Sequence, residues 1–135
     1  MKFEELNFDI LGDERGALIA LQANQQIPFS FQRVFYIYNV TDDGKRGCHA
    51  NRKSEFVLIC LHGKCRVKIR CDKEREQIVV LDSPNKGLWL DKMVWKEMYD
   101  FSRDAVLMVI SNELYDPEEY INDFEQYVCE ASTSR

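Results

Sequence analysis

The residues best suited to chemistry lie in one short segment, Arg46–Glu55. It contains His49, one of two histidines in the chain, with Asn51 and Lys53 at alternate positions after it. Because side-chain direction repeats every two residues along a strand, these three are expected on one face. A neutral imidazole can take a proton from a carbon acid, and cations such as Arg46 favour an anionic substrate beside it. The segment therefore indicates a proton-transfer site; the alternative is a strand that ends in a solvated basic turn.

The neighbouring Cys48 raises two other kinds of site. A cysteine–histidine nucleophile needs both side chains together, whereas adjacent strand residues point to opposite faces. A zinc site needs recognised ligand spacing, and the five cysteines and two histidines show none, with no C-x-x-C pair. The odd number of cysteines also disfavours a disulfide framework and favours a reducing compartment. We therefore expect no metal.

Length and charge narrow the class of protein. The 135 residues, 45% of them hydrophobic, are expected to form a single globular domain over 1–135. A net charge of −5 argues against binding to nucleic acid. No run approaches the roughly 20 apolar residues that span a membrane, and the N-terminus lacks the apolar core of a signal peptide. A cytoplasmic protein without nucleic-acid or membrane partners is expected.

The elements that must position the site are mostly strands. Short apolar runs separated by turn signals, about ten residues apart, predict an all-β sandwich or barrel. Strands are expected at 7–11, 17–23, 32–40, 46–51, 55–61, 64–71, 76–82, 87–91, 94–99 and 105–112. Turns are expected at 12–16, 42–44, 62–63 and 83–87, with a charged hairpin tip at 72–76.

The one helical signal begins at Asp116-Pro117, which combine an N-cap with a proline at the first helical position. Apolar residues at helical spacing follow, namely Tyr120, Ile121, Phe124, Tyr127 and Val128. This stripe is expected to pack against the sheet. Residues from about 129 to 135 are expected to form a frayed tail.

Two strands mix aromatic and polar residues. In the run from Arg33 to Asn39, Tyr36 and Tyr38 share one face, and the run from Trp95 to Asp100 carries Glu97 and Tyr99. Polar groups are costly to bury without partners, so a barrel lined by them would hold a ligand pocket. The alternative is an open sheet that exposes these side chains to solvent.

Motifs in the same order over about 100 residues resemble the sugar-nucleotide 3,4-ketoisomerases that act on dTDP-4-keto-6-deoxyglucose. The resembling segments are Asp13-Glu-Arg-Gly16, Ile27-Pro-Phe-Ser30, Arg33-Val-Phe-Tyr-Ile-Tyr38, Arg46-Gly-Cys-His-Ala50, Glu55-Phe-Val-Leu-Ile-Cys-Leu61, Leu81-Asp-Ser-Pro84, Gly87-Leu88 and Val94-Trp-Lys-Glu-Met-Tyr-Asp-Phe-Ser102. Two of them are shared with the related dTDP-sugar 3,5-epimerases. The resemblance implies a cupin fold, that is, a double-stranded β-helix or jelly-roll barrel, with a short C-terminal helix.

The resemblance also implies roles for individual residues. His49 matches the catalytic base, and Arg15 and Arg46 match arginines that meet the nucleotide's diphosphate in the epimerases. Further substrate-binding groups are expected at Arg33, Tyr36, Tyr38, Lys53, Trp95, Glu97 and Tyr99. The family needs no metal or cofactor. It forms homodimers that exchange an N-terminal strand, so Arg15 is expected to serve the neighbouring pocket.

The chain departs from the family at two places. Asn51 stands where the family has the second histidine of His-Ala-His, and the segment Lys96–Tyr99 lacks the family's histidines at both ends. Asparagine can hydrogen-bond a sugar or enediol oxygen but cannot shuttle a proton. We place Asn51 in the catalytic site, with His49 as a sufficient base; the alternative is a site with reduced or altered catalysis.

The expected reaction converts dTDP-4-keto-6-deoxyglucose to a dTDP-3-keto-6-deoxyhexose of galacto configuration, by proton transfer from C3 to C4. It would feed an aminotransferase that makes 3-amino-3,6-dideoxy sugars for surface glycans such as O-antigens. Two other functions stay open. One is a related enzyme, either a 3,5-epimerase or an isomerase of another nucleotide sugar. The other is a catalytically silent module that binds sugar nucleotides.

Overall fold

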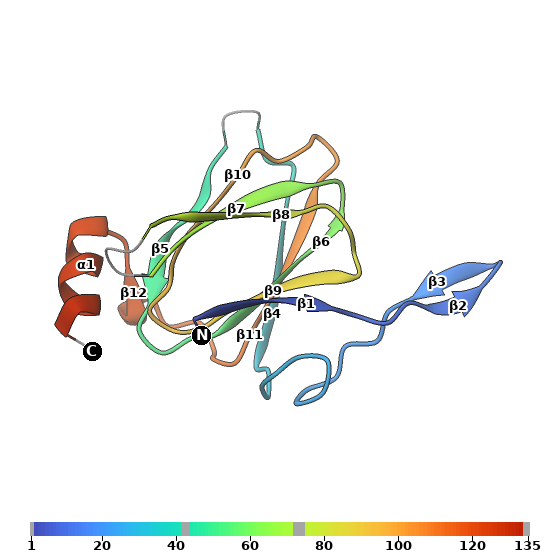
Figure 1. Cartoon of the computed structure of the whole chain (residues 1–135), viewed down its shortest axis with the longest axis horizontal. Helices are drawn as coiled ribbons and strands as arrows, with labels where there is room; N and C mark the ends of the chain where they lie inside the picture. The colour runs from blue at the N-terminus through green and yellow to red at the C-terminus, as the bar shows by residue number, and fades with distance from the viewer. Residues whose placement is uncertain (1, 42–43, 72–74, 134–135) are drawn as a thin grey trace.

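The computed structural model describes residues 2–41, 44–71 and 75–133. Its strands form two antiparallel sheets that face each other, with a hairpin projecting from one end (Figure 1). The first sheet has the order β1 (Phe3–Asn7), β9 (Lys86–Leu90), β6 (Phe56–His62), β11 (Val106–Ser111) and β4 (Arg33–Tyr38). The second has the order β12 (Tyr120–Ile121), β5 (Arg46–Asn51), β10 (Trp95–Tyr99), β7 (Cys65–Arg70) and β8 (Gln77–Leu81).

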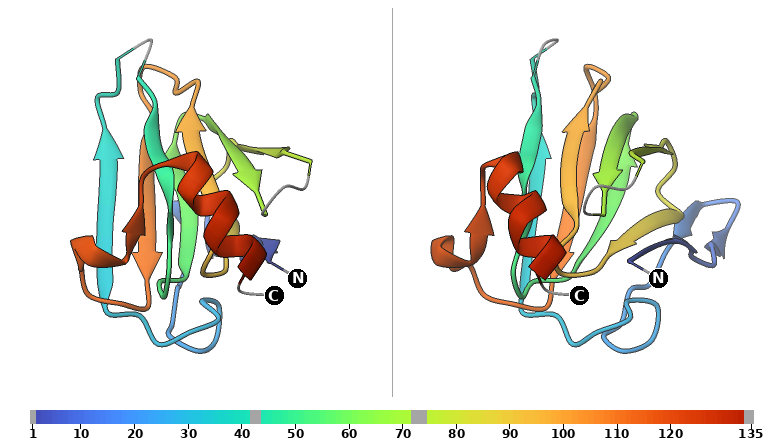
Figure 2. Two further views of the ribbon diagram at one scale, coloured as in Figure 1. Left: turned by 90° about the vertical axis from the view of Figure 1, so that its left-hand side faces the viewer. Right: turned by 60° about the vertical axis from the view of Figure 1, so that its left-hand side comes forward.

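The projecting hairpin consists of β2 (Leu11–Asp13) and β3 (Gly16–Leu18). All of its residues are exposed, and it stands off from the barrel in Figure 1 and in the right-hand view of Figure 2. The turn expected at 12–16 is confirmed here. The strand expected at 7–11 is wrong, because Asn7 ends β1 and Leu11 begins β2.

Strand β1 was missed because its sequence, Phe3–Asn7, carries little apolar alternation. Main-chain pairing with β9 forms it, from Phe3 opposite Leu90 to Asn7 opposite Lys86. The strand expected at 17–23 is also shorter, because β3 ends at Leu18. Positions 42–43 of the expected turn and 72–74 of the expected charged tip lie outside the described residues.

The apolar core fills the space between the two sheets, and smaller clusters cover their outer faces. The central cluster includes Leu58, Val67, Leu81, Leu88, Leu90 and Leu107, all essentially inaccessible to solvent. On the outer face of the first sheet, Phe8, Ile27 and Phe29 from connecting segments pack against β6 and β11. On the outer face of the second sheet, residues of β5, β10 and β12 lie under the C-terminal helix.

The C-terminal segment differs from the single helix expected from Asp116. A short 3-10 helix, η1 (Pro117–Glu119), is followed by β12 and then by α1 (Phe124–Thr133). The expected cap is present, since the Asp116 carboxylate accepts from the Glu118 N–H at 3.0 Å. Pairing of Tyr120 with Asn51 then holds the chain extended, which is why the helical stripe is interrupted. The tail expected from about 129 is helical through Thr133, and Ser134 and Arg135 lie outside the described residues.

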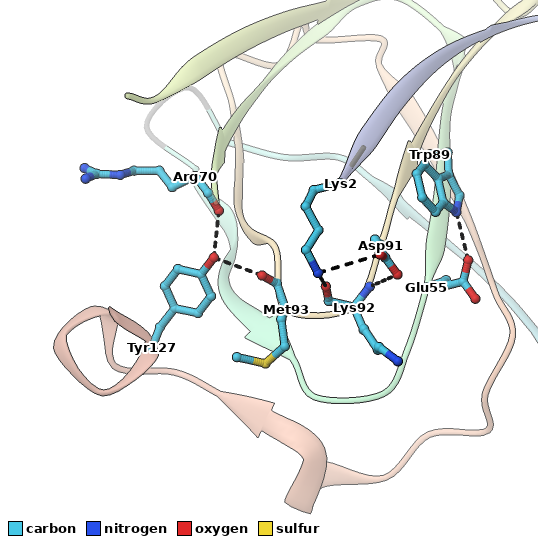
Figure 3. Close-up of polar contacts among 8 residues, drawn as sticks. All are labelled: Lys2, Glu55, Arg70, Trp89, Asp91, Lys92, Met93 and Tyr127. Atoms are coloured by element: carbon cyan, nitrogen blue, oxygen red, sulfur yellow. Dashed lines mark hydrogen bonds and ion pairs between the residues drawn. The ribbon is translucent and has the colours of Figure 1, made fainter. Parts of the chain in front are cut away.

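Helix α1 is fixed across the outer face of the second sheet (Figure 2). The buried Tyr127 hydroxyl donates toward the carbonyl oxygens of Arg70 at 3.0 Å and Met93 at 2.9 Å (Figure 3). The Trp95 ring lies under the helix, with its centroid 5.2 Å from that of Phe124. The helix therefore determines which face of β10 is turned outward.

Candidate active site

A cavity of about 120 Å³ lies between the sheets, where β5, β10 and β12 face β4, β6 and β11. Most of its wall is apolar, but four side chains that line it can donate hydrogen bonds: Arg46, His49, Lys96 and Tyr120. The remaining lining residues are Phe35, Ile37, Gly47, Phe56, Leu58, Met98 and Val109.

A bulge in β5 brings Arg46 and His49 to the same cavity. His49 pairs with Lys96, whereas Arg46 pairs with Met98, so the three-residue step on β5 matches a two-residue step on β10. The bulge needs two residues with positive φ, 82° at Gly47 and 60° at Cys48. A side chain at Gly47 would place its Cβ 3.0 Å from the Met98 sulfur, so glycine fits best there.

The same bulge turns Cys48 away from His49. Cys48 packs with the cluster under α1, on the outer side of the sheet. Burial raises the pKa of its thiol, the reverse of what an activated nucleophile requires. The structure therefore does not bring Cys48 and His49 together as a nucleophilic pair.

His49 is a partly buried imidazole that packs against a tyrosine ring. Its ring centroid lies 4.7 Å from that of Tyr120, with the planes tilted by 53°. Burial lowers the pKa of His49 to about 4, and the positive charges of Lys96 and Arg33 act in the same direction. The ring is therefore neutral near pH 7 and able to accept a proton.

Lys96 is the group that sequence reasoning missed. It is 3% exposed, and its Nζ donates to the Asn51 Oδ1 at 3.2 Å and to the Val94 carbonyl oxygen at 3.4 Å. The ammonium also lies 4.7 Å from the centroid of the Phe56 ring. Burial lowers the pKa of Lys96 to about 7, against the opposing pull of the Glu119 carboxylate. Both protonation states of this amine are therefore populated near neutral pH.

Asn51 and Glu119 form a buried polar layer behind the cavity wall. Asn51 is buried and turns its amide oxygen to Lys96, so it does not itself line the cavity. The Glu119 carboxylate accepts from the N–H groups of Lys53 and Ser54, each at 3.0 Å, and from the Ser54 hydroxyl. Burial raises the pKa of Glu119, but these hydrogen bonds outweigh it and leave the pKa below its ordinary value.

Of the other expected binding residues, Arg33 lies close to the cavity and Lys53 does not. The Arg33 Nη2 is 3.5 Å from the hydroxyl of Tyr120, a lining residue. Lys53 lies in the loop after β5, where its Nζ is 3.3 Å from the Asp116 carboxylate in an exposed ion pair.

The structure does not bring the expected aromatic and acidic residues of β4 and β10 to the cavity. Tyr36 and Tyr38 are 64% and 58% exposed on the outer face of β4. Trp95 lies under α1, and Glu97, on the same outer face, accepts from the Trp95 Nε1 at 3.0 Å. Tyr99 follows at the next outward position, with the Lys68 ammonium 5.5 Å from its ring. On β10 the inward positions are the alternate ones, Lys96 and Met98.

Arg15 lies at the turn of the projecting hairpin. Its guanidinium is exposed and donates to the nearby Asp13 carboxylate at 2.7 Å. The hairpin projects from one end of the barrel (Figure 1), and Arg15 is not among the residues that line the cavity.

The described residues contain neither a cluster of metal ligands nor a membrane-spanning helix. Within the ranges given above, no three histidine, cysteine, aspartate or glutamate side chains converge as a metal site would require. In the same ranges, no helix is long and apolar enough to cross a membrane.

Comparison with known proteins gives matches along nearly the whole chain. The family described as FdtA: WxcM-like, C-terminal matches residues 1–132. A curated relative, the TDP-4-oxo-6-deoxy-alpha-D-glucose-3,4-oxoisomerase of Aneurinibacillus thermoaerophilus, is 43% identical over 127 residues, which cover 94% of this chain and 91% of that protein.

Solved structures also match nearly the whole chain. A 3,4-ketoisomerase from Helicobacter canadensis has 38% identity and a TM-score of 0.94, with 98% of each chain covered. A sugar 3,4-ketoisomerase from Thermoanaerobacterium thermosaccharolyticum in complex with TDP has 34% identity and a TM-score of 0.95, covering 98% of this chain and 96% of that one. A histidine-to-asparagine variant of the latter has been solved with TDP-4-keto-6-deoxyglucose.

These matches confirm the cupin-like fold and the resemblance drawn from the motifs. The chain belongs to the FdtA, WxcM-like family, which places it among the sugar 3,4-ketoisomerases.

Proposed function

We propose that this protein is an isomerase that converts dTDP-4-keto-6-deoxyglucose to the corresponding dTDP-3-keto-6-deoxyhexose. The observation that carries the proposal is the neutral imidazole of His49 at the wall of a cavity between the sheets. The relatives named above for this reaction support the choice of substrate.

In the proposed reaction, the 4-keto group acidifies the C3 hydrogen and His49 removes that hydrogen as a proton. The bonding electrons form the C3–C4 double bond, and the carbonyl electrons move to O4. We assign the stabilisation of the enediolate to Tyr120, which lines the cavity, and to Arg33, whose Nη2 is 3.5 Å from the Tyr120 hydroxyl; such donors are often worth about 100-fold in rate or more. The C3 hydroxyl then loses its proton and C3 becomes the ketone, while C4 receives a proton and O4 takes up the proton that makes it the 4-hydroxyl. Oxidation at C3 balances reduction at C4, so the reaction needs no cofactor.

The product is proposed to have galacto configuration at C4. In the gluco ring the C3 hydrogen is axial, and a proton delivered to C4 on the same face leaves the 4-hydroxyl axial. His49 reaches the sugar from the wall formed by β5 and β10, so delivery from that wall gives this outcome.

The cavity's size indicates where the nucleotide lies. Its volume of about 120 Å³ is well below the several hundred Å³ of pockets that enclose larger ligands. We infer that the cavity receives the keto sugar and that the diphosphate and base lie beyond its mouth, toward Arg46.

A homodimer in which the β2–β3 hairpin reaches the neighbour would complete that nucleotide site. The hairpin and its approach expose the apolar side chains of Ile10, Leu11 and Leu18, the kind of surface that a partner covers. Arg15 at its turn would then supply a second cation to the neighbour's diphosphate.

Mixing two inactive variants tests this exchange. His49→Asn and Arg15→Ala subunits that share dimers should restore one complete site per mixed dimer, about a quarter of wild-type activity after random reassembly. A mixture that gains no activity, despite mass-spectrometric proof of mixed dimers, would show that Arg15 does not act across the interface.

Trapping the product tests the reaction itself. Incubation with dTDP-4-keto-6-deoxyglucose and a 3-aminotransferase should give a 3-amino-3,6-dideoxy sugar nucleotide. Thermal stabilisation by dTDP without any such product would instead support a silent binding module. A cytoplasmic location and a place before this aminotransferase in surface-glycan synthesis are part of the proposal.

A further inference from the structure

Two titratable side chains lie next to each other on one wall of the cavity. His49 on β5 and Lys96 on β10 are direct partners in the antiparallel register, and both line the cavity. Side chains at such positions lie about 5 Å apart at their Cβ atoms and point the same way. A sugar ring held against this wall would meet both groups on one face.

We propose that Lys96 is the second acid–base group of the site, delivering to C4 the proton that completes the reaction begun by His49, and that Asn51 holds the amine in position for this step. This inference rests on the proposed ketoisomerase function. It assigns separate groups to the two carbon centres, in place of one base that serves both.

The surroundings of Lys96 suit a group that donates a proton and then regains one near neutral pH. The amine is buried. Its charged or titratable neighbours include His49, Arg46 and Tyr120 on the cavity wall, Glu119 from η1, and Arg33 beside Tyr120. Burial destabilises the ammonium, whereas Glu119 and the face of the Phe56 ring stabilise it. The resulting balance leaves the pKa of Lys96 at about 7, where donation and recovery of a proton are both accessible.

Asn51 restricts where the amine points. Its amide oxygen accepts from the Lys96 Nζ at 3.2 Å, and the Val94 carbonyl oxygen lies at 3.4 Å. An amide holds the amine without neutralising it, whereas a carboxylate there would keep Lys96 charged and a protonated histidine would repel it. Asparagine at this place therefore suits a neighbouring lysine, and Asn51 is a positioning residue.

Protons balance over the cycle. His49 gains the C3 proton, Lys96 gives one proton to C4, and the hydroxyl proton at O3 is replaced by one at O4. The protonated imidazole and the neutral amine then return to their starting states by exchange with solvent. Because both groups act from one wall, this route also gives the galacto product.

The test separates the two half-reactions by deuterium labelling. In deuterated water, Lys96→Met should still exchange the C3 hydrogen of recovered substrate, because His49 is intact. Its formation of the 3-keto product should fall by about 100-fold, the usual size of a general-acid contribution. His49→Asn should lose both exchange and product formation. Wild-type turnover is measured first, since its absence would count against the ketoisomerase function and not against Lys96.

Two results would overturn the assignment. One is product formation by Lys96→Met within a few-fold of the wild-type rate. The other is that Lys96→Met loses both C3 exchange and product formation, although circular dichroism and dTDP-induced stabilisation show that it is folded and binds the nucleotide. Asn51→Asp tests the positioning role. It should move the alkaline limb of the pH–rate profile for product formation to higher pH, because a carboxylate keeps Lys96 charged, and C3 exchange should persist. An unshifted limb would remove Asn51 from this role.

Discussion

The two halves of the barrel interior are built differently. Around β7, β8 and β9 the space between the sheets is filled by side chains such as Leu81, Leu88 and Leu90, with no more than 1% of each exposed. Around β5, β10 and β12 the interior carries His49 and Lys96 beside a cavity. Buried polar groups cost stability unless they are paired, so the apolar half must supply much of the favourable free energy of folding. Stability and chemistry are thus divided between opposite ends of one barrel, and substitutions in each end should separate them.

The largest expected effect is in the polar half. His49→Asn should lower turnover of the keto sugar by about 1,000-fold, because it removes the base and leaves a polar side chain that cannot accept the proton. The free energy of unfolding should stay within about 1 kcal/mol of wild type. Stopped-time assays and urea unfolding measure the two quantities.

The chain offers a matched control for that change. His62, the other histidine, is exposed and lies 3.2 Å from the Asp104 carboxylate at the far end of β6. His62→Asn should leave turnover unchanged, and an equal loss in both variants would remove the special role given to His49.

The apolar half should respond in the opposite way. Leu88→Ala leaves a cavity among fully buried side chains and should lower the free energy of unfolding by about 2–5 kcal/mol. Turnover per folded molecule should remain close to wild type, because Leu88 does not line the cavity. Urea unfolding combined with active-site titration checks this; a loss of turnover per folded molecule would show that the halves are not independent.

Acid should weaken the fold through the polar half. The pKa of His49 is lowered to about 4 in the folded chain, whereas the unfolded imidazole titrates near 6.5. The unfolded state therefore binds a proton first as the pH falls, and stability is lost between about pH 6.5 and 4, by up to about 3 kcal/mol. His49→Asn should lack this part of the decline. If the free energy of unfolding fell equally with pH in the two proteins over this range, the assigned burial of the ring would be contradicted.

A smaller effect is expected where α1 docks. Tyr127→Phe removes a hydroxyl that bonds at 3.0 Å and 2.9 Å to two main-chain carbonyl groups, and should lower the free energy of unfolding by about 1 kcal/mol. Turnover should change little, because the ring still packs beside Trp95 and keeps β10 in place. Thermal unfolding and a turnover assay measure both effects, and a large loss of activity would mean that this hydroxyl helps to set the register of β10.

The sequence motifs predicted the family, the cupin-like fold and the position of His49, because each depends on short segments in a fixed order. The motifs did not predict the inward face of β10, since alternation alone does not say which of two faces is inside. Trp95 is covered by α1, which begins only at Phe124, and that covering turns Lys96 inward. Strand β12 was hidden for a similar reason, because pairing with β5 overrides the helical spacing of Tyr120 and Ile121.

The most direct measurement of the ketoisomerase function follows wild-type protein and dTDP-4-keto-6-deoxyglucose in deuterated water by NMR. The expected product has its ketone at C3, solvent deuterium at C4 and an axial 4-hydroxyl. Deuterium at C5 with the ketone retained at C4 would contradict the function proposed for this cavity and indicate an epimerase instead.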